Sequence, residues 1–79
     1  MQKSLSSSKQ KSFLALLRQI REEAGLRQVD VAKRLDQPQS FVSKYESGER
    51  RLDLLELELV CVACETEIDE FVKRYRAVT

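Results

Sequence analysis

Apolar residues recur at helical spacing in five successive stretches of the chain, separated by short polar segments. In the first stretch they follow one face of a helix, at Phe13, Leu14, Leu17, Ile20 and Ala24. Gly25 comes next and can adopt the left-handed geometry in which many helices end. The pattern predicts a first helix over residues 12–24.

A second helix is predicted over residues 28–35. Its inward-facing side chains are Val31, Ala32 and Leu35. The preceding residue is Arg27, whereas Ser, Thr, Asp or Asn is usual at this capping position, and a missing cap costs about 1 kcal/mol. Gln28 is then expected at the first turn with its amide free to bind elsewhere.

A turn at Asp36 and Gln37 separates the second helix from the third. Pro38 suits the first position of a helix, because its φ is fixed and its missing N–H is not needed there. Gly48 can adopt the left-handed geometry of a helix end. We therefore expect the third helix to begin at Pro38 and to stop at Gly48.

Two further helices are expected in the C-terminal third. Asp53 and Glu56 form a capping pair for a fourth helix over residues 54–65, which is apolar over most of its circumference and must be covered on more than one side. Thr66 and Asp69 can cap a fifth helix. Its apolar stripe consists of Ile68, Phe71, Val72, Tyr75 and Val78. No segment alternates with a period of two, so the expected fold is all-α, a compact domain of five helices over residues 12–79.

Residues 1–11 are rich in Ser, Lys and Gln and cannot bury enough apolar area to order themselves, so we expect a flexible arm. Its cations could contact phosphates, or the arm could have no role. A chain of 79 residues buries only about 60% of the surface that its unfolded form exposes, so oligomerisation would stabilise it. Because no long apolar run or leader is present, we expect a cytoplasmic protein without a membrane partner.

One stripe of the third helix carries short hydrogen-bonding side chains and a single cation. Its members recur at intervals of one, three and four positions: Gln39, Ser40, Ser43, Lys44 and Ser47. The opposite stripe, with Val42 and Tyr45, is apolar and should face a core. Solvated faces more often carry Glu and Lys pairs, so the stripe suits a surface that reads hydrogen-bonding groups on a partner. An ordinary polar face remains the alternative.

The charge is unevenly distributed, although the net charge is only +1. Residues 1–50 hold ten Lys and Arg against six Asp and Glu, a net +4, whereas residues 51–79 hold four against seven, a net −3. A basic front and an acidic back are typical of a molecule that faces phosphates on one side.

The chain contains no histidine, which excludes Ser/His and Cys/His nucleophilic pairs and most zinc chemistry. We therefore expect no enzyme, no metal, no cofactor and no small-molecule ligand. Cys61 and Cys64 form a C-x-x-C within a strongly helical stretch, without a second ligand pair. They are interpreted as two buried thiols on one helix face, with a redox switch as the alternative.

Two short helices joined by a tight turn, the second with a polar outer stripe, match the helix-turn-helix arrangement. Here the chain resembles the phage-repressor and Cro-like helix-turn-helix regulators, often called Xre-like, whose domain is lambda-repressor-like. The likeness is carried by Arg21, Gly25-Leu26, Gln28, Val31-Ala32 and residues 43–48, reading SKYESG. The small size also resembles restriction–modification controller proteins and small phage repressors.

The resemblance implies that the third helix enters the major groove of DNA. The residues that it places at base edges are Gln39, Ser40, Ser43 and Lys44, and those that it places at phosphates are Gln28, Ser47 and Arg50. Gln can pair bidentately with adenine, and Lys with guanine. The family also suggests a buried ion pair between Arg21 and Glu46, which would fix the orientation of the third helix. The chain departs from the family where Glu65 and Thr66 replace a common glycine, which suggests a different packing angle for the fifth helix.

The favoured hypothesis is a sequence-specific transcriptional regulator that binds double-stranded DNA at an operator as a homodimer. Its two recognition helices would lie about 34–36 Å apart. The resemblance and the apolar stripe of the fifth helix suggest a dimer interface at Phe71, Tyr75 and Val78, with part of the fourth helix. The alternative is a protein-interaction module, antitoxin-like or an adaptor, whose helix-turn-helix does not read DNA. Salt dependence of DNA binding distinguishes the two.

Overall fold

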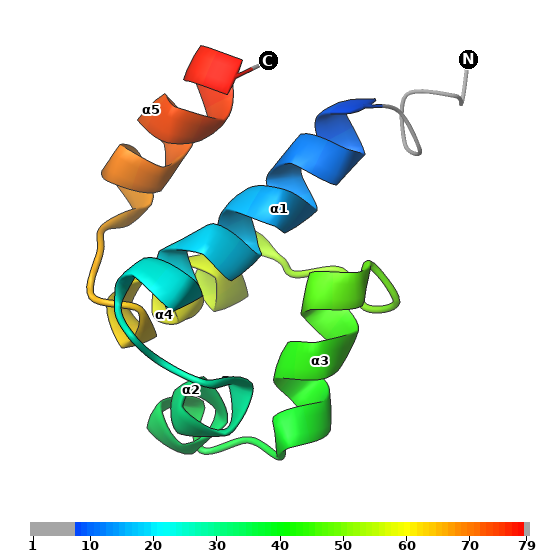
Figure 1. Cartoon of the computed structure of the whole chain (residues 1–79), viewed down its shortest axis with the longest axis vertical. Helices are drawn as coiled ribbons and strands as arrows, with labels where there is room; N and C mark the ends of the chain where they lie inside the picture. The colour runs from blue at the N-terminus through cyan, green and yellow to red at the C-terminus, as the bar shows by residue number, and fades with distance from the viewer. Residues whose placement is uncertain (1–7, 79) are drawn as a thin grey trace.

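The computed structural model describes the backbone of residues 8–78 and the side chains of residues 8–77. Its helices are α1 (Ser8–Glu23), α2 (Gln28–Leu35), α3 (Gln39–Ser47), α4 (Leu54–Ala63) and α5 (Ile68–Val78). Helix α1 runs through the middle of the molecule, with α2 and α3 at one end and α5 towards the other (Figure 1). The described residues form no strand, which confirms the all-α prediction.

The core forms where the apolar stripes of all five helices meet. Its buried apolar side chains include Leu17, Ile20, Val31, Ala32, Val42, Tyr45, Val60, Cys61 and Phe71. Helices as short as the eight-residue α2 are not stable in isolation, so this shared packing holds each of them in place. None of the helices in the described part of the chain is long and apolar enough to cross a membrane.

Helix α1 begins at Ser8, four positions earlier than predicted. The cause is tertiary contact that the local composition does not reveal. The ammonium group of Lys9 lies 5.7 Å from the centre of the Tyr75 ring on α5, and Gln10 is half-buried. Residues 8–11, which were assigned to the flexible arm, therefore belong to α1. Residues 1–7 lie outside the described part of the chain.

The prediction that α3 begins at Pro38 is wrong by one residue. Pro38 has extended backbone (φ −69°, ψ 157°) and is the capping residue, so the helix starts at Gln39. The Pro38 carbonyl already accepts the amide N–H of Phe41 at 2.9 Å. At the other end, Gly48 takes the predicted left-handed geometry with φ 86°. A side chain there would also collide with Leu14, because a Cβ would lie 2.9 Å from its Cδ1 atom.

Helix α4 ends at Ala63, two residues before the predicted end. Glu65 adopts φ 64°, a left-handed conformation that glycine favours, and the N–H of Thr66 donates to the Cys61 carbonyl at 2.9 Å. The family's glycine position is thus occupied by a strained glutamate. Arg34 on α2 holds this turn by donating to the Ala63 carbonyl at 2.9 Å and to the Glu65 carboxylate at 3.0 Å.

Part of the apolar stripe of α5, where we predicted the dimer surface, packs against α1. Phe71 is buried, and its ring packs edge-on against Phe13 of α1 with centroids 5.8 Å apart. Tyr75 is half-buried beside the same ring, at 6.1 Å. The side chain of Val78 lies outside the described residues. Phe71 is therefore first of all a core residue, and the dimer contact at Phe71, Tyr75 and Val78 stays a prediction.

The exposed large apolar side chains lie instead mostly on α4. Leu54 is 74% exposed, Leu55 64%, Leu59 52% and Val62 65%, and Val72 of α5 adds a further 39%. Because the inner face of α4 is already buried, the outer face is the second apolar side that the sequence pattern predicted. We call these five side chains the α4 ridge.

The two cysteines are free and buried, Cys61 on the inner side of α4 and Cys64 at the position that caps its C-terminal end. Burial raises the pKa of both thiols to about 11, so they stay protonated and unreactive at neutral pH. This agrees with their interpretation as packed thiols.

Candidate nucleic-acid interface

The outer face of α3 presents the four predicted base-reading side chains to solvent. Gln39, Ser40, Ser43 and Lys44 are all exposed. The opposite face is fixed by Val42 and Tyr45, which are fully buried, and by the Phe41 ring, packed edge-on against Tyr45 at 5.6 Å. In the described structure, one face of α3 is therefore packed in the core, and the polar stripe is the face that is exposed to solvent.

The predicted ion pair between Arg21 and Glu46 is present and joins α1 to α3. Arg21 Nε donates to Glu46 Oε2 at 2.6 Å, and Nη2 donates to Oε1 at 3.0 Å. The remaining Nη1 group donates to the Leu26 carbonyl at 3.0 Å, which ties the loop before α2 to the same guanidinium. The hydrogen bond to Glu46 raises the pKa of Arg21 above its ordinary value, so the guanidinium stays charged at any physiological pH.

Gln28 does not have the free amide that the sequence suggested. Its Nε2 group donates to Glu46 Oε1 at 3.1 Å, and its Oε1 atom accepts Gln39 Nε2 at 2.8 Å. The first helical residue of α2 thus links the buried ion pair to the first helical residue of α3. Sequence reasoning missed this connection, because nothing in the spacing of the residues brings Gln28 and Gln39 together.

The missing cap of α2 is partly replaced from within the helix. The Asp30 carboxylate accepts the backbone N–H of Arg27 at 2.8 Å and its side-chain Nη2 group at 2.9 Å. The side-chain and backbone hydrogen bonds from Arg27 lower the pKa of Asp30 from 3.8 to about 2. The carboxylate is therefore held in its charged form at the start of α2.

A polar groove runs beside α3, where a DNA backbone could lie. Its volume is about 450 Å³, and its lining comes from α1, α2 and α3: Arg18, Arg21, Gln28, Ser43, Glu46 and Ser47. Two predicted phosphate contacts, Gln28 and Ser47, therefore share one groove. Sequence reasoning missed Arg18, a third candidate there, although its position three residues before Arg21 is the spacing that places both on one side of α1.

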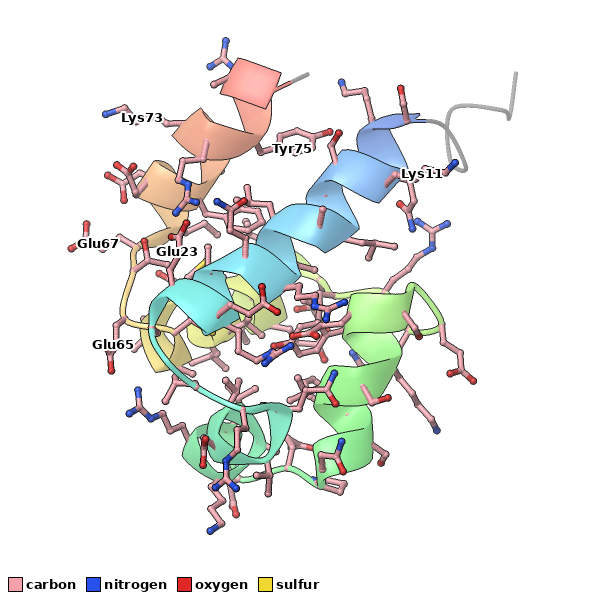
Figure 2. All side chains as sticks on the ribbon, in the orientation of Figure 1. Lys11, Glu23, Glu65, Glu67, Lys73 and Tyr75 are labelled. Atoms are coloured by element: carbon pink, nitrogen blue, oxygen red, sulfur yellow. The ribbon has the colours of Figure 1, made fainter. Side chains whose placement is uncertain are left out.

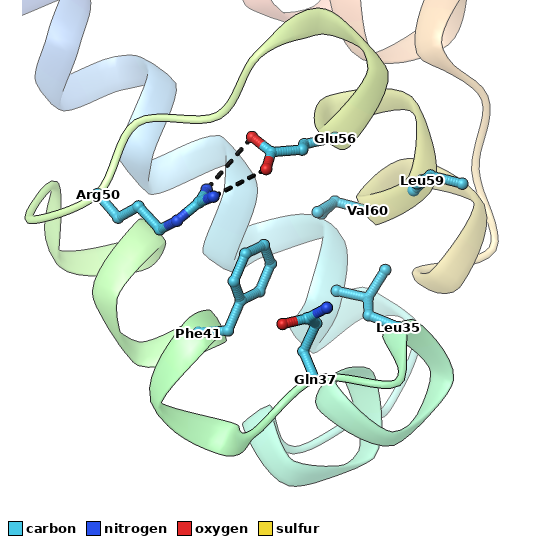
Figure 3. A pocket seen from close by; sticks show the side chains of 7 residues that line it. All are labelled: Leu35, Gln37, Phe41, Arg50, Glu56, Leu59 and Val60. Carbon is cyan, nitrogen blue, oxygen red and sulfur yellow. Dashed lines mark hydrogen bonds and ion pairs between the residues drawn. The ribbon is translucent and has the colours of Figure 1, made fainter.

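Ser47 and Arg50 are engaged locally at the end of α3. The Ser47 hydroxyl donates to the Lys44 carbonyl at 3.0 Å and accepts the N–H of Glu49 at 3.3 Å. Arg50 pairs with Glu56 through two hydrogen bonds of 3.2 and 2.8 Å, and its guanidinium lies 4.7 Å from the centre of the Phe41 ring (Figure 3). Arg50 thus joins α3 to α4, and its charge is balanced within the protein.

The acidic residues that Figure 2 labels lie on the side of the molecule away from α3. Glu23, Glu65 and Glu67 gather there, near the ends of α1 and α4 and the start of α5 (Figure 2). Glu23 is paired with Arg74 of α5 through two hydrogen bonds of 2.9 Å. Glu65 is likewise paired with Arg34 of α2, at 3.0 Å.

Comparison with known proteins places this arrangement in a family. The family model described as helix-turn-helix matches residues 17–71, which include all of α2, α3 and α4. Among solved structures, the chain is similar to an XRE-family like protein from Pseudomonas syringae pv. tomato str. DC3000. The two are 38% identical with a TM-score of 0.87, and the match covers 98% of this chain and 94% of the other. No curated protein matches. The chain therefore belongs to the helix-turn-helix family and is an Xre-like DNA-binding regulator.

Proposed function

We propose that this protein regulates transcription by binding an operator as a homodimer, with α3 of each copy in the major groove. The observation that supports the proposal is that the polar stripe of α3 is exposed while the opposite face of the same helix is buried in the core. Gln39 and Lys44 carry groups that pair with adenine and guanine edges, and the two serines are short enough to contact either. The buried Arg21–Glu46 pair limits how the helix can tilt beneath them.

Phosphate contacts beside this stripe would set the register of the protein on DNA. Ser47 and Arg18 line the polar groove next to α3. Within residues 8–77, Arg18 is paired with the exposed Glu22 of the next turn, at 3.0 Å. Such an exposed pair is weak and exchanges readily for a phosphate. Arg50 would first have to leave Glu56, so we assign it a structural role before a phosphate role.

The α4 ridge supplies the surface for a second copy of the chain. Two hollows each have one of its side chains in their lining. One, of about 280 Å³, has Leu59 on its rim and extends to Phe41 and Leu35, as Figure 3 shows. The other, of about 390 Å³, has Val72 and Tyr75 on its rim.

A surface that carries both ridge and hollows can be complementary to itself, which is what a two-fold symmetric interface requires. Leucine side chains of one copy would fill the hollows of its partner and so remove the exposed apolar area of both. Tyr75 and Phe71 both line the second hollow, so they would lie at the edge of this interface.

Selection of bound sequences from a random pool of double-stranded DNA tests the proposal. A regulator of this kind selects a palindrome whose half-sites are one helical turn apart. Its affinity also falls steeply with added salt, by about 0.9 logarithmic units per phosphate contact for each tenfold rise in salt. Recovery of no common sequence, together with salt-independent binding, would favour the adaptor or antitoxin-like alternative.

A further inference from the structure

Helix α3 carries the exposed polar stripe, and α4 carries most of the α4 ridge. The link between these two helices therefore decides where the stripe lies relative to a second copy. The packing partners of α3 are chiefly α1 and α2. Among the described residues, the hydrogen bonds that join the end of α3 to α4 run through one side chain, that of Arg50 in the loop after α3.

Both ends of this connection are held by backbone groups. The amide N–H of Arg50 donates to the Lys44 carbonyl of α3 at 3.1 Å. The guanidinium of Arg50 donates to the Glu56 carboxylate at 3.2 and 2.8 Å, and Glu56 Oε1 also accepts the N–H of Asp53 at 2.9 Å. Asp53 caps α4, so the carboxylate that binds Arg50 is fixed to the first turn of that helix. The connection therefore reaches from the last turn of α3 to the first turn of α4.

The guanidinium has little freedom between its partners. It lies 4.7 Å from the centre of the Phe41 ring on α3 (Figure 3), and Nη1 also donates to the Arg51 carbonyl at 2.9 Å. A bidentate pair of arginine and carboxylate fixes orientation as well as distance. The side chains of Arg50 and Glu56 are 40% and 28% exposed, and a partly exposed pair contributes little to the free energy of unfolding. We therefore expect this pair to affect the angle between α3 and α4 more than the stability.

Glu56 lies on the part of α4 that would meet a second copy. Leu54 and Leu55 of the α4 ridge belong to the same helical turn, and Leu59 follows one turn later. In a two-fold symmetric dimer held through this ridge, a displacement of α3 relative to α4 is repeated in both copies. The separation of the two α3 helices therefore changes by up to twice that displacement.

We propose that Arg50 and Glu56 are positioning residues that set the separation of the two α3 helices, and thereby the half-site spacing that the dimer accepts. This inference rests on the proposed function, namely DNA binding through α3 and dimerisation through the α4 ridge. It gives Arg50 a part in specificity that differs from the phosphate contact implied by the family resemblance.

The test measures binding to operators whose half-sites are kept and whose central spacer is shortened or lengthened by one base pair. Such a change rotates one half-site by about a tenth of a helical turn relative to the other. We expect the wild type to lose roughly tenfold or more in affinity, because either the protein or the DNA must deform. The loss should fall below about threefold in Arg50→Met and in Glu56→Gln, which keeps the acceptor for the Asp53 N–H and loses the charge.

An unchanged dependence on spacer length in both variants overturns the proposal. Loss by one common factor at every spacing in Arg50→Met, without any effect of Glu56→Gln, overturns it as well, because that is the behaviour of a phosphate contact. Glu67→Gln is the matched control, since it removes the same charge from an exposed carboxylate without an ion pair in the described part of the chain. It should keep the spacing preference of the wild type. Thermal unfolding establishes that each variant is folded.

A measurement without DNA separates this proposal from the proposed function. Residual dipolar couplings of backbone N–H groups, recorded in weakly aligned protein, report the orientation of α3 relative to α4. In the wild type, the couplings of both helices should fit one common alignment. Arg50→Met and Glu56→Gln should reduce the couplings of α3 or change its orientation, and Glu67→Gln should not.

Unchanged couplings in both variants refute the positioning role even if the protein binds its operator as a dimer. A wild type that binds DNA without any preference for spacer length refutes the proposed function and this inference together.

Discussion

Arg21 on α1 and Glu46 on α3 are joined by two parallel hydrogen bonds of 2.6 and 3.0 Å, although they lie 25 positions apart in the sequence. The two side chains are nearly enclosed by the core around Tyr45. A bidentate pair of this kind fixes both the distance and the relative orientation of the helices that it joins. The orientation of α3 is therefore set by an electrostatic contact as well as by apolar packing.

Removal of one partner of this pair should destabilise the protein severely. Glu46→Ala or Arg21→Ala leaves a buried charge without compensation, and we expect a loss of about 3–5 kcal/mol in the free energy of unfolding, measured by urea denaturation. Arg18→Ala, which breaks an exposed pair with Glu22, is the matched control and should cost less than about 1 kcal/mol.

A double variant, Arg21→Met with Glu46→Leu, distinguishes two contributions to the free energy of unfolding. One is the destabilisation by an unpaired buried charge, and the other is the stabilisation by the ion pair itself. Because apolar residues of similar volume can replace a buried ion pair, we expect the double variant to be more stable than either single one. Equal losses in all three variants would show that the pair itself, and not the stranded charge, supplies the stability.

Lys44→Ala should relax the sequence preference at one base pair of each half-site. Lys44 is exposed on the outer face of α3, and a lysine paired with guanine contributes about 1–3 kcal/mol of discrimination. The measurement is binding to a set of operators with single substitutions. Arg18→Ala provides the contrast, because loss of a phosphate contact weakens binding to every sequence and reduces the salt slope by about one. A uniform loss with Lys44→Ala would mean that this residue does not read bases.

The number of helices could be predicted from the sequence because each apolar stripe follows one helix face, as in Phe13, Leu17 and Ile20. The element ends were less predictable. The first turn of α1 contacts α5 through Lys9 and Tyr75, and Glu65 is left-handed where the chain turns from α4 towards α5. Both depend on contacts between helices, about which local propensity carries no information.

The site was predictable to a different degree for each of its parts. The outward stripe of α3 follows from periodicity alone, and the Arg21–Glu46 pair followed from the family resemblance. The partners of Gln28 and Arg50 could not be foreseen, because a long polar side chain at a helix end reaches several neighbours and only the packing selects one. Phe71 shows a related difficulty, since an amphipathic stripe does not reveal whether its own core or a second copy covers it, and here the core buries most of the ring.

Stability should depend on pH through Asp30 in acid. Its pKa is lowered in the folded state from 3.8 to about 2 by the hydrogen bonds from Arg27, so folding favours the charged form. This contribution is present above about pH 4 and is lost as the pH falls towards 2. We expect the difference in unfolding free energy between the wild type and Asp30→Asn to shrink over this interval. Arg27→Met, which removes the side-chain donor, should weaken the pH dependence as well.

The α4 ridge can be tested by introducing a charge at its centre. Leu59→Glu should shift the protein to monomer in sedimentation equilibrium at micromolar concentration, because a carboxylate would be buried between two copies. Ala15→Glu on the exposed side of α1 is the matched control and should leave the association unchanged. Operator affinity should fall in Leu59→Glu, while each monomer stays folded. A wild type that is monomeric throughout this range would refute the dimer interface.

Glu65→Gly should stabilise the protein, which is unusual for a change to glycine. Glu65 has φ 64°, a conformation that costs a residue with a Cβ about 1–2 kcal/mol and costs glycine almost nothing. The change also removes the exposed pair with Arg34, which contributes less than about 1 kcal/mol. We therefore expect a gain of up to about 1 kcal/mol in urea denaturation. Glu65→Ala loses the same pair but keeps the backbone cost, so it should be less stable than the wild type. A gain with alanine equal to that with glycine would mean that the backbone is not strained there.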